Sequence, residues 1–175
     1  MLKKIDVNKL NENPFVLLDR EWALIAAGNK DGHNMMTASW GGLGVLWNYN
    51  VATVYIRPSR YTLEFVEREK YFSLCFFGKN KAMHKICGSK SGREIDKTAA
   101  TGLTPVFEDG TVYFHEAELV LICRKLYETQ LDNTKFLDPN IESFYTEIPN
   151  DYHKMFIGEI VKAYRSDMRG SGEQK

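Results

Sequence analysis

The sequence predicts a mainly β domain, folded as an antiparallel barrel with a few short helices. Short runs of apolar, aromatic and β-branched residues recur along the chain and are separated by Gly, Pro, Asn and Asp at turn positions. Segments with the apolar spacing of a helix are few, and they do not alternate regularly with the strand-like runs as they would in βα units. Closely spaced strands of this kind favour an antiparallel barrel.

The first half of the chain is expected to contain an arm, four strands and one helix. Residues 1–13 are polar and should form a peripheral arm. Pro58 ends one strand-like run because it has no N–H for a strand ladder. Leu63 and Val66, three residues apart, indicate the buried face of a short helix over residues 63–69. The strands are predicted over residues 15–18, 22–27, 35–40 and 51–56, with a turn at residues 29–32.

The second half is expected to complete the barrel with longer strands. Residues 71–77 are apolar on both faces, as expected beside a barrel wall or a subunit contact. Gly158 should interrupt the last strand. In chain order we predict a strand at 71–77, a helix at 80–87 ended by Gly88, a loop at 88–92, a hairpin of 104–107 and 112–114 around Asp109 and Gly110, a strand at 118–127, a loop or short helix at 135–149, and a strand at 155–164.

The composition indicates one domain without an overall charge. We take residues 14–167 as the domain and residues 168–175 as a flexible polar tail. Lys plus Arg and Asp plus Glu both number 23, so no global field favours nucleic acid or an acidic membrane surface. The basic N-terminus is not followed by an apolar segment, and no apolar run approaches the length of a membrane span. We therefore expect no signal peptide and no membrane anchor.

The three cysteines are widely spaced and include no C-x-x-C pair. This spacing argues against a disulfide framework and against a cysteine zinc site, and it favours the reducing cytoplasm. Cys123 lies in an apolar run and is expected to be an inert buried thiol.

Residues 33–62 carry a pattern suited to a phosphate ligand. Thr37, Ser39, Ser59 and Thr62 are short hydroxyl donors on either side of Arg60, whose guanidinium supplies the counter-charge. Thr62 also opens the predicted helix, so the partial positive charge of the helix N-terminus should point to the same place.

A flat aromatic ligand could lie between these two groups of hydroxyls. Trp40 supplies an aromatic face there, and Ala38, Gly41 and Gly42 let a ligand approach the backbone closely. The alternative interpretation is structural: ordinary strand residues, a core tryptophan, and a turn followed by a helix cap.

Four ordered segments resemble one known family. NMMTASW at residues 34–40, RPSRYT at 57–62, SGREIDKTAATGLTP at 91–105 and HKMFIGEI at 153–160 together resemble the flavin reductase-like family of FMN-binding split-barrel flavoproteins, which includes the flavoredoxins. The resemblance implies a six-stranded antiparallel barrel with Greek-key order and a homodimer that buries the flavin near the subunit contact. It also implies FMN as the cofactor.

The resemblance also assigns residues to the flavin site. Lys97 would reach the flavin or its phosphate from the second segment, although a solvated lysine at the start of a helix is the alternative. His153 would touch the ring or a nicotinamide, and a surface or core histidine is the alternative. The ring and phosphate-side cradle would comprise Asn34, Thr37, Ala38, Ser39 and Trp40; the phosphate grip Ser59, Arg60 and Thr62; and the second contact segment Ser91, Gly92 and Lys97.

Other catalytic signatures are absent from the sequence. The glycines at 41, 42 and 44 do not form G-x-G-x-x-G, residues 88–92 do not have the spacing of a P-loop, and His115-Glu116 is not followed by a second histidine at helical spacing. The four histidines are far apart in sequence, so no metal site is predicted. Cofactor chemistry remains, since the flavin carries the electrons while the protein binds and orients it.

Three functions are compatible with a flavin cradle. The first hypothesis is an NAD(P)H-dependent flavin oxidoreductase, with NADH or NADPH as the donor. The alternative is a flavoredoxin-like electron carrier reduced by a protein partner, and the third is a flavin-binding protein for storage or sensing. The same cradle serves all three, because the function depends on what reaches the exposed face of the flavin.

Overall fold

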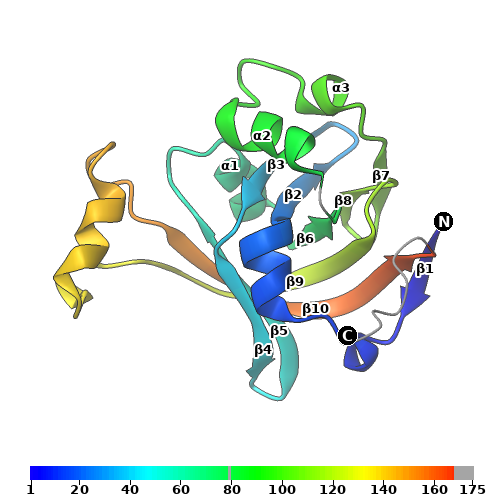
Figure 1. The fold of residues 1–175 in the computed structure, drawn as a ribbon, viewed down its shortest axis with the longest axis horizontal. Coiled ribbons are helices and arrows are strands. Elements are labelled where there is room, and N and C mark those ends of the chain that lie inside the picture. Colours follow the sequence, from blue (N-terminus) through cyan, green and yellow to red (C-terminus); the bar gives the residue numbers. More distant parts are fainter. Residues whose placement is uncertain (79, 168–175) are drawn as a thin grey trace.

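The computed structural model describes residues 1–78 and 80–167, so the expected tail at 168–175 lies outside the described residues. In this part of the chain, one antiparallel sheet of eight strands curls around a core, and a separate hairpin packs against it (Figure 1). The strand order is β3-β2-β6-β9-β10-β5-β4, with β1 paired to β10. The strands are β1 (Leu2–Ile5), β2 (Ala23–Asn29), β3 (Gly32–Ala38), β4 (Gly41–Leu46), β5 (Tyr49–Ile56), β6 (Tyr71–Phe76), β9 (Leu119–Gln130) and β10 (Lys154–Ser166), and the hairpin is β7 (Pro105–Glu108) with β8 (Thr111–Phe114).

The central strand β6 is buried on both faces because its residues are apolar or aromatic apart from Ser73, whose buried hydroxyl donates to the Val112 carbonyl. Along β6, Phe72, Leu74 and Phe76 belong to the core inside the curled sheet, whereas Cys75 points to a second core on the other side. The second core is covered by the helix α2 (Lys81–Ser89) and by the β7–β8 hairpin, to which Phe114 belongs. The mostly apolar pattern of residues 71–77 therefore reflects burial within one chain rather than a subunit contact.

Gly158 interrupts β10, as predicted. The register of β10 against β9 shifts between Ile157 and Gly158. A Cβ at Gly158 would lie 2.8 Å from Phe72 and 2.9 Å from Cys123, so only glycine lets these core side chains pack against the strand. The bulge bends β10, which pairs with β9 along its length and also with β5 and β1.

Three short helices gather at one end of the sheet (Figure 1). They are α1 (Thr62–Arg68), α2 (Lys81–Ser89) and α3 (Lys97–Thr101). In α1, Leu63 and Val66 are buried as expected. In α2, Asn80 caps the first turn by accepting the Met83 N–H, and the helix continues one residue beyond the Gly88 at which we expected it to end.

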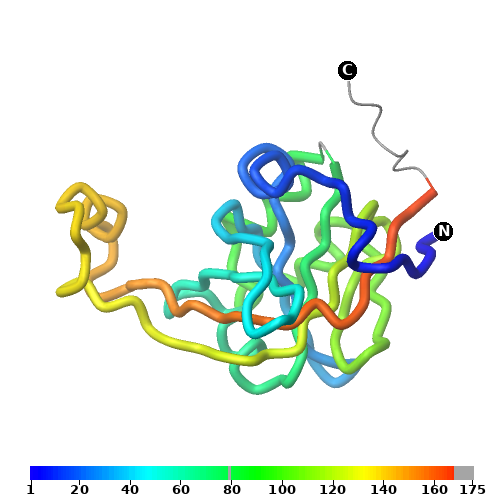
Figure 2. The backbone as a smooth tube through the Cα atoms, turned by 90° about the horizontal axis from the view of Figure 1, so that it is seen from below, coloured from blue at the N-terminus to red at the C-terminus, as the bar shows by residue number. Residues whose placement is uncertain are grey.

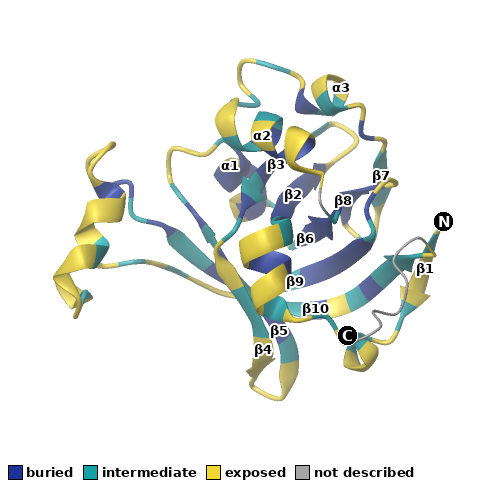
Figure 3. Cartoon of the chain, viewed as in Figure 1, coloured by how far each residue is buried: buried dark blue, intermediate teal, exposed yellow. Residues whose placement is uncertain are grey.

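Residues 131–152 form a segment that projects from the barrel (Figure 2). It contains two short 3₁₀ helices, η3 (Asn133–Lys135) and η4 (Pro139–Tyr145), in agreement with the predicted loop or short helix. The Leu131 N–H donates to the His153 carbonyl at 2.9 Å and closes the base of the segment. Much of the segment is exposed (Figure 3).

The structure confirms the predicted fold class, with two differences in its strands. The sheet has eight strands in the described residues rather than six, because Gly41–Leu46 and Leu2–Ile5 also form strands. Residues 15–18 were predicted as a strand, but the structure has a π-helical turn over Val16–Glu21. Asn13 starts this turn by accepting the N–H groups of Val16 and Leu17, and Trp22, at φ 69°, ends it. The remaining predicted strands and the Asp109-Gly110 hairpin are present within a few residues of the expected bounds.

Candidate functional site

The candidate site lies where the sheet is split. The path of paired strands starts at β3 and ends at β4, and the chain crosses between these two edges through Ser39 and Trp40. A cavity of about 180 Å³, which we call the Trp40 cavity, opens at this crossing. Its lining combines the end of β3 and the crossing with one residue of β5, two arginines that follow β5 and the histidine just before β10: Met36, Thr37, Ala38, Ser39, Trp40, Tyr55, Arg57, Arg60 and His153.

His153 forms one wall of the Trp40 cavity. Its ring centroid lies 5.0 Å from that of Trp40, and its Nδ1 is hydrogen-bonded to the Tyr145 hydroxyl at 2.8 Å. Burial, and then the positive charge of Arg57, lower the pKa of His153 to about 4. The imidazole is therefore neutral near pH 7, and Nε2 is the ring nitrogen left for a ligand in the cavity.

A second cavity, the Arg60 cavity, continues from the first. It encloses about 160 Å³ and shares Met36 and Arg60 with the Trp40 cavity. Arg60 donates from Nη1 to the Gly88 carbonyl at 3.0 Å, which fixes its guanidinium at the junction. The lining is polar and cationic: Ser59, Arg60, Tyr61, Thr62, Ser89, Lys90, Ser91, Gly92, Glu94 and Lys97, with Met36.

Lys97 is a buried ammonium group rather than a solvated surface lysine. Its Nζ donates to the carbonyls of Met35 at 2.8 Å and Cys87 at 2.9 Å. Burial lowers the pKa of Lys97; the nearby Cys87 raises it and the charge of Arg60 lowers it further. Since an ammonium group has three protons, one remains for a ligand in the Arg60 cavity.

Asn34 and Thr62 are joined by a buried hydrogen bond at the edge of the Arg60 cavity, which Thr62 lines and Asn34 does not. Asn34 is 5 % exposed and donates from Nδ2 to the Thr62 hydroxyl at 3.0 Å. A Cβ at Gly92 would lie only 2.2 Å from Asn34 Oδ1, so glycine is needed for the loop to approach. These contacts hold β3, α1 and the loop before α3 together, and they assign Asn34 and the Thr62 side chain to support of the site.

Ser59 is held by a residue that the sequence did not indicate. Asp151, 3 % exposed, accepts the Ser59 N–H at 2.8 Å and the Ser59 hydroxyl at 2.7 Å. Arg57 lies 3.7 Å from the same carboxylate and donates to the Phe144 carbonyl at 2.7 Å. The Ser59 hydroxyl therefore donates its proton to Asp151 and not to a ligand. The same contacts connect residues 131–152 to the turn that contains Arg60.

Thr37 is linked to α2 in a similar way. Its hydroxyl donates to the His84 carbonyl at 2.8 Å and lies 3.2 Å from His84 Nδ1. Burial, and then the charge of Lys81, lower the pKa of His84 to about 4. Thr37 thus lines the Trp40 cavity while it also joins β3 to α2.

The structure brings the predicted residues together in two connected groups. Each cavity alone is smaller than the roughly 300–1,000 Å³ of typical small-molecule pockets, but one ligand could extend through both. The first cavity offers a tryptophan, a tyrosine and a neutral histidine, and the second offers an arginine, two lysines and short hydroxyl side chains. This donor set fits a flat aromatic ring joined to a phosphate. The prediction from the sequence did not include three residues of the candidate site: Tyr55, Arg57 and Asp151.

A further cavity, the Phe15 cavity, opens beside Ser39 and Trp40. It encloses about 500 Å³ and is lined by the π-helical turn and β4, including Phe15, Leu18 and Leu43. Phe15 is 82 % exposed and Trp40 45 % exposed. A second apolar molecule could therefore approach the Trp40 cavity from this side.

Three other observations concern the described part of the chain. All three cysteines are buried and unpaired, and burial raises the pKa of Cys123, as expected for an inert thiol. Among residues 1–78 and 80–167, no three His, Cys, Asp or Glu side chains gather as a metal site requires. None of the helices described is long and apolar enough to cross a membrane.

Comparisons with known proteins agree with the fold. The flavin reductase like domain family matches residues 17–172. The fold is similar to flavoredoxin from Methanosarcina acetivorans, with TM-score 0.65 and 23% identity over 94% of this chain and 76% of that one. It is also similar to flavoredoxin of Desulfovibrio vulgaris (Miyazaki F), with TM-score 0.66 and 19% identity over 99% and 83%.

A third similar structure is an FMN-binding protein from Thermus thermophilus with bound p-hydroxybenzaldehyde, with TM-score 0.66 and 19% identity over 98% of this chain and 86% of that one. No curated protein matches the sequence. The family match spans most of the chain and includes all four segments on which the resemblance was based. The chain therefore belongs to the family of flavin reductase like domains.

Proposed function

We propose that this protein binds FMN across the Trp40 and Arg60 cavities and works as an NAD(P)H-dependent flavin oxidoreductase. The observation that carries the proposal is the position of Arg60, which lines both cavities at once. One side of this guanidinium is an aromatic slot and the other side is a cationic, hydroxyl-lined hollow. FMN has the same two parts in the same order, a flat ring system and a phosphate.

The residues of the chain then have distinct roles. Arg60 and the remaining Lys97 proton would bind the phosphate, whose charge they oppose. Trp40 and Tyr55 would flank the ring, and His153 would present Nε2 to it from a neutral imidazole. The bound flavin would supply the hydride and electron chemistry.

Arg57 would influence the charge at the ring side of the site. It lines the Trp40 cavity and is one of its two cationic side chains. Asp151, at 3.7 Å, offsets part of this charge and holds it in place. A cation beside the ring favours whichever form of the ligand carries more negative charge, so Arg57 is expected to help the flavin accept electrons.

A flavoredoxin-like electron carrier is the second candidate function. Two of the similar structures are flavoredoxins, and the sequence has no dinucleotide-binding fingerprint. In that case a redox protein would reach the flavin in place of a nicotinamide. The exposed apolar approach through Phe15 and Trp40 serves either a small donor or a protein surface.

We also propose that the protein forms a homodimer in the cytoplasm. The hairpin of β4 and β5 has an exposed tip (Figure 3). Its exposed apolar side chains are Val45, Leu46, Trp47 and Tyr49. The ring centroid of Trp47 lies 6.4 Å from that of Tyr127, which is also exposed. Exposed apolar patches of this kind mark interaction surfaces. The three buried thiols suit a reducing compartment. Sedimentation at micromolar concentration would contradict the dimer if it showed only monomer.

The anaerobic visible spectrum tests the proposed function. Protein reconstituted with FMN and desalted is recorded before and after addition of NADH and then NADPH, with free FMN at equal concentration as the control. Retained yellow colour that bleaches within seconds supports the oxidoreductase. If the yellow colour is retained and neither nucleotide changes it, the flavoredoxin-like electron carrier becomes the favoured function. A colourless protein contradicts FMN binding.

A further inference from the structure

Thr37 lines the Trp40 cavity close to the place where this cavity meets the Arg60 cavity. It follows Met36, which lines both cavities, and neighbouring residues of a strand are about 3.3 Å apart. In FMN the chain that leads to the phosphate is attached to the central ring, at N10, and N5 belongs to the same ring. A flavin that extends through both cavities would therefore present its central ring, rather than its far end, to Thr37.

Both hydrogen bonds of the Thr37 hydroxyl within the protein involve His84. Its Oγ1 donates to the His84 carbonyl at 2.8 Å and lies 3.2 Å from the ring nitrogen Nδ1. A hydroxyl has one proton and two lone pairs, and a carbonyl can only accept. The single proton of Thr37 is therefore directed to the His84 backbone, away from the cavity.

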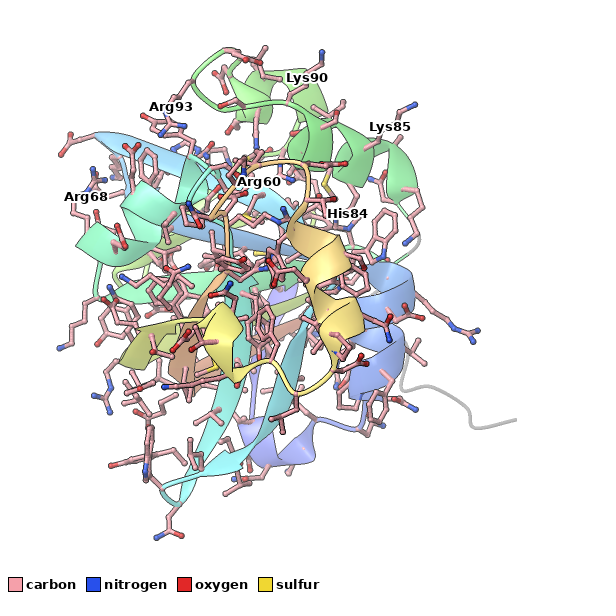
Figure 4. The ribbon with its side chains drawn as sticks, turned by 90° about the vertical axis from the view of Figure 1, so that its left-hand side faces the viewer. Arg60, Arg68, His84, Lys85, Lys90 and Arg93 are labelled. Carbon is pink, nitrogen blue, oxygen red and sulfur yellow. The ribbon has the colours of Figure 1, made fainter. Side chains whose placement is uncertain are left out.

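The surroundings of His84 favour the tautomer with the proton on Nδ1. The side chain points from α2 into the protein and is 1 % exposed, whereas its neighbour Lys85 is exposed (Figure 4). Nε2 is buried and has no hydrogen-bond partner among residues 1–78 and 80–167, and the rings of Trp22 and Phe77 pack edge-on at 5.9 and 6.2 Å. A proton on Nε2 would leave that N–H unpaired and would also make Nδ1 compete with the carbonyl for the Thr37 proton. A proton on Nδ1 leaves only the Nε2 lone pair without a partner, which is the smaller loss.

Thr37 thus offers the cavity a lone pair and no proton. It donates to the His84 carbonyl, accepts from Nδ1–H and has one acceptor position left. In oxidised flavin N5 is itself an acceptor, so the two atoms cannot form a hydrogen bond. In reduced flavin N5 carries a hydrogen and is a donor. A group that binds one of two forms more tightly shifts the equilibrium toward that form.

We propose that Thr37, oriented by His84, accepts a hydrogen bond from N5–H of reduced FMN and thereby makes the site bind reduced FMN more tightly than oxidised FMN. The hydrogen and two electrons arrive together as a hydride, and NAD(P)H, the donor in the proposed function, becomes NAD(P)⁺. Thr37 touches the cofactor, whereas His84 is a positioning residue that acts through it. This inference rests on the FMN-binding part of the proposed function.

The midpoint potential of bound FMN tests the proposal. The protein is loaded with FMN and titrated anaerobically with dithionite against a reference dye, so the measurement does not require NAD(P)H activity. Thr37→Val removes the hydroxyl and keeps the branched shape, and Thr37→Ser keeps the hydroxyl. His84→Phe keeps a flat ring between its aromatic neighbours and removes Nδ1. The matched control is Thr53→Val, the same change on β5, outside the lining of both cavities.

Thr37→Val should reduce the preference for reduced FMN about tenfold, the effect of one hydrogen bond. For a two-electron couple this lowers the midpoint potential by about 30 mV. The dissociation constant of oxidised FMN should not rise, because this form loses no hydrogen bond. Thr37→Ser should keep most of the potential of the parent. His84→Phe should lower it by less than Thr37→Val, because the hydroxyl can then also rotate toward the cavity. Thr53→Val should leave it unchanged.

A midpoint potential of Thr37→Val equal to or above that of the parent overturns the proposal. A decrease that Thr53→Val reproduces, or that Thr37→Ser does not reverse, overturns it as well. An unchanged potential in His84→Phe overturns the positioning role of His84. Failure of the parent to bind FMN is a different result, since it removes the proposed function itself and this inference with it.

Discussion

Replacing Arg60 with alanine should weaken FMN binding strongly while it leaves riboflavin binding almost unchanged. The two ligands share the same ring system, and only FMN carries the phosphate. Arg60 lines both cavities and is held at their junction by the Gly88 carbonyl. The comparison between the two ligands therefore separates the phosphate contact from any general disturbance of the site.

The magnitude follows from one charge-assisted contact. Such a contact contributes about 1.5–3 kcal/mol, which corresponds to a loss of roughly 10- to 150-fold in FMN affinity. Arg60→Ala also removes the hydrogen bond to Gly88, which at an exposed site contributes about 0.5–1.5 kcal/mol to stability at most. Arg60→Lys should recover part of the affinity, because lysine keeps the charge but not the planar guanidinium.

Fluorescence titration with both ligands gives the ratio of the riboflavin and FMN dissociation constants for the parent, Arg60→Ala and Arg60→Lys. Lys85→Ala is the control, because it removes a positive charge from the exposed face of α2, outside the lining of the Trp40 and Arg60 cavities. Raising the ionic strength should narrow the gap between FMN and riboflavin in the parent, because salt screens the charge. Equal losses for FMN and riboflavin in Arg60→Ala would show that Arg60 only supports the fold. An unchanged FMN dissociation constant would remove it from the phosphate site.

Three further predictions concern the residues that support the site. Asp151→Asn should lower the free energy of unfolding by about 2 kcal/mol, because two hydrogen bonds to a buried carboxylate lose their ionic character; an unchanged urea midpoint would contradict this. Between pH 7 and pH 5, the free energy of unfolding should fall by about 2 kcal/mol for each of His84 and His153. Each has a pKa of about 4 in the folded protein and about 6.5 in the unfolded chain, so the unfolded chain binds protons first as the pH falls. A free energy of unfolding that stays constant over this range would refute the prediction. Gly92→Ala should lower the free energy of unfolding by about 1–3 kcal/mol, since the new methyl group would displace Asn34 from its buried hydrogen bond. Thermal unfolding of both proteins, with the free energies compared at the Tm of the parent, measures this difference.

The fold was largely predictable because its strands carry local signals. The Asp109-Gly110 turn needs positive φ at both residues, and the structure has 56° and 77° there. Two elements carried no such signal. The strand Gly41–Leu46 has three glycines, which lower its strand propensity. The turn Val16–Glu21 depends on backbone bonds to Asn13 and from Trp22, and its apolar residues resemble a short strand.

The candidate site was only partly predictable, since its members come from distant segments. Residues next to one another in sequence, such as Ser59 and Arg60, were predicted as one group, and the structure places both in the lining of one cavity. Asp151 lies 92 positions after Ser59, and nothing in its neighbourhood marks it as the acceptor that uses both Ser59 donors. The sequence also could not show that two backbone carbonyls bind the Lys97 ammonium group, because every residue has such a carbonyl and none is marked by its residue type.

The split between β3 and β4 links ligand binding to the mechanical integrity of the barrel. The described strands are joined by backbone pairing from β3 around to β4, and the candidate site occupies the break between these two edges. A ligand in the Trp40 cavity contacts the end of β3 and Tyr55 of β5, the strand that pairs with β4, so its binding free energy opposes separation of the two ends of this path. At a free ligand concentration of 100 Kd, binding adds about 2.7 kcal/mol to the free energy of unfolding. Cellular supply of the ligand would then set how long the folded protein resists proteolysis.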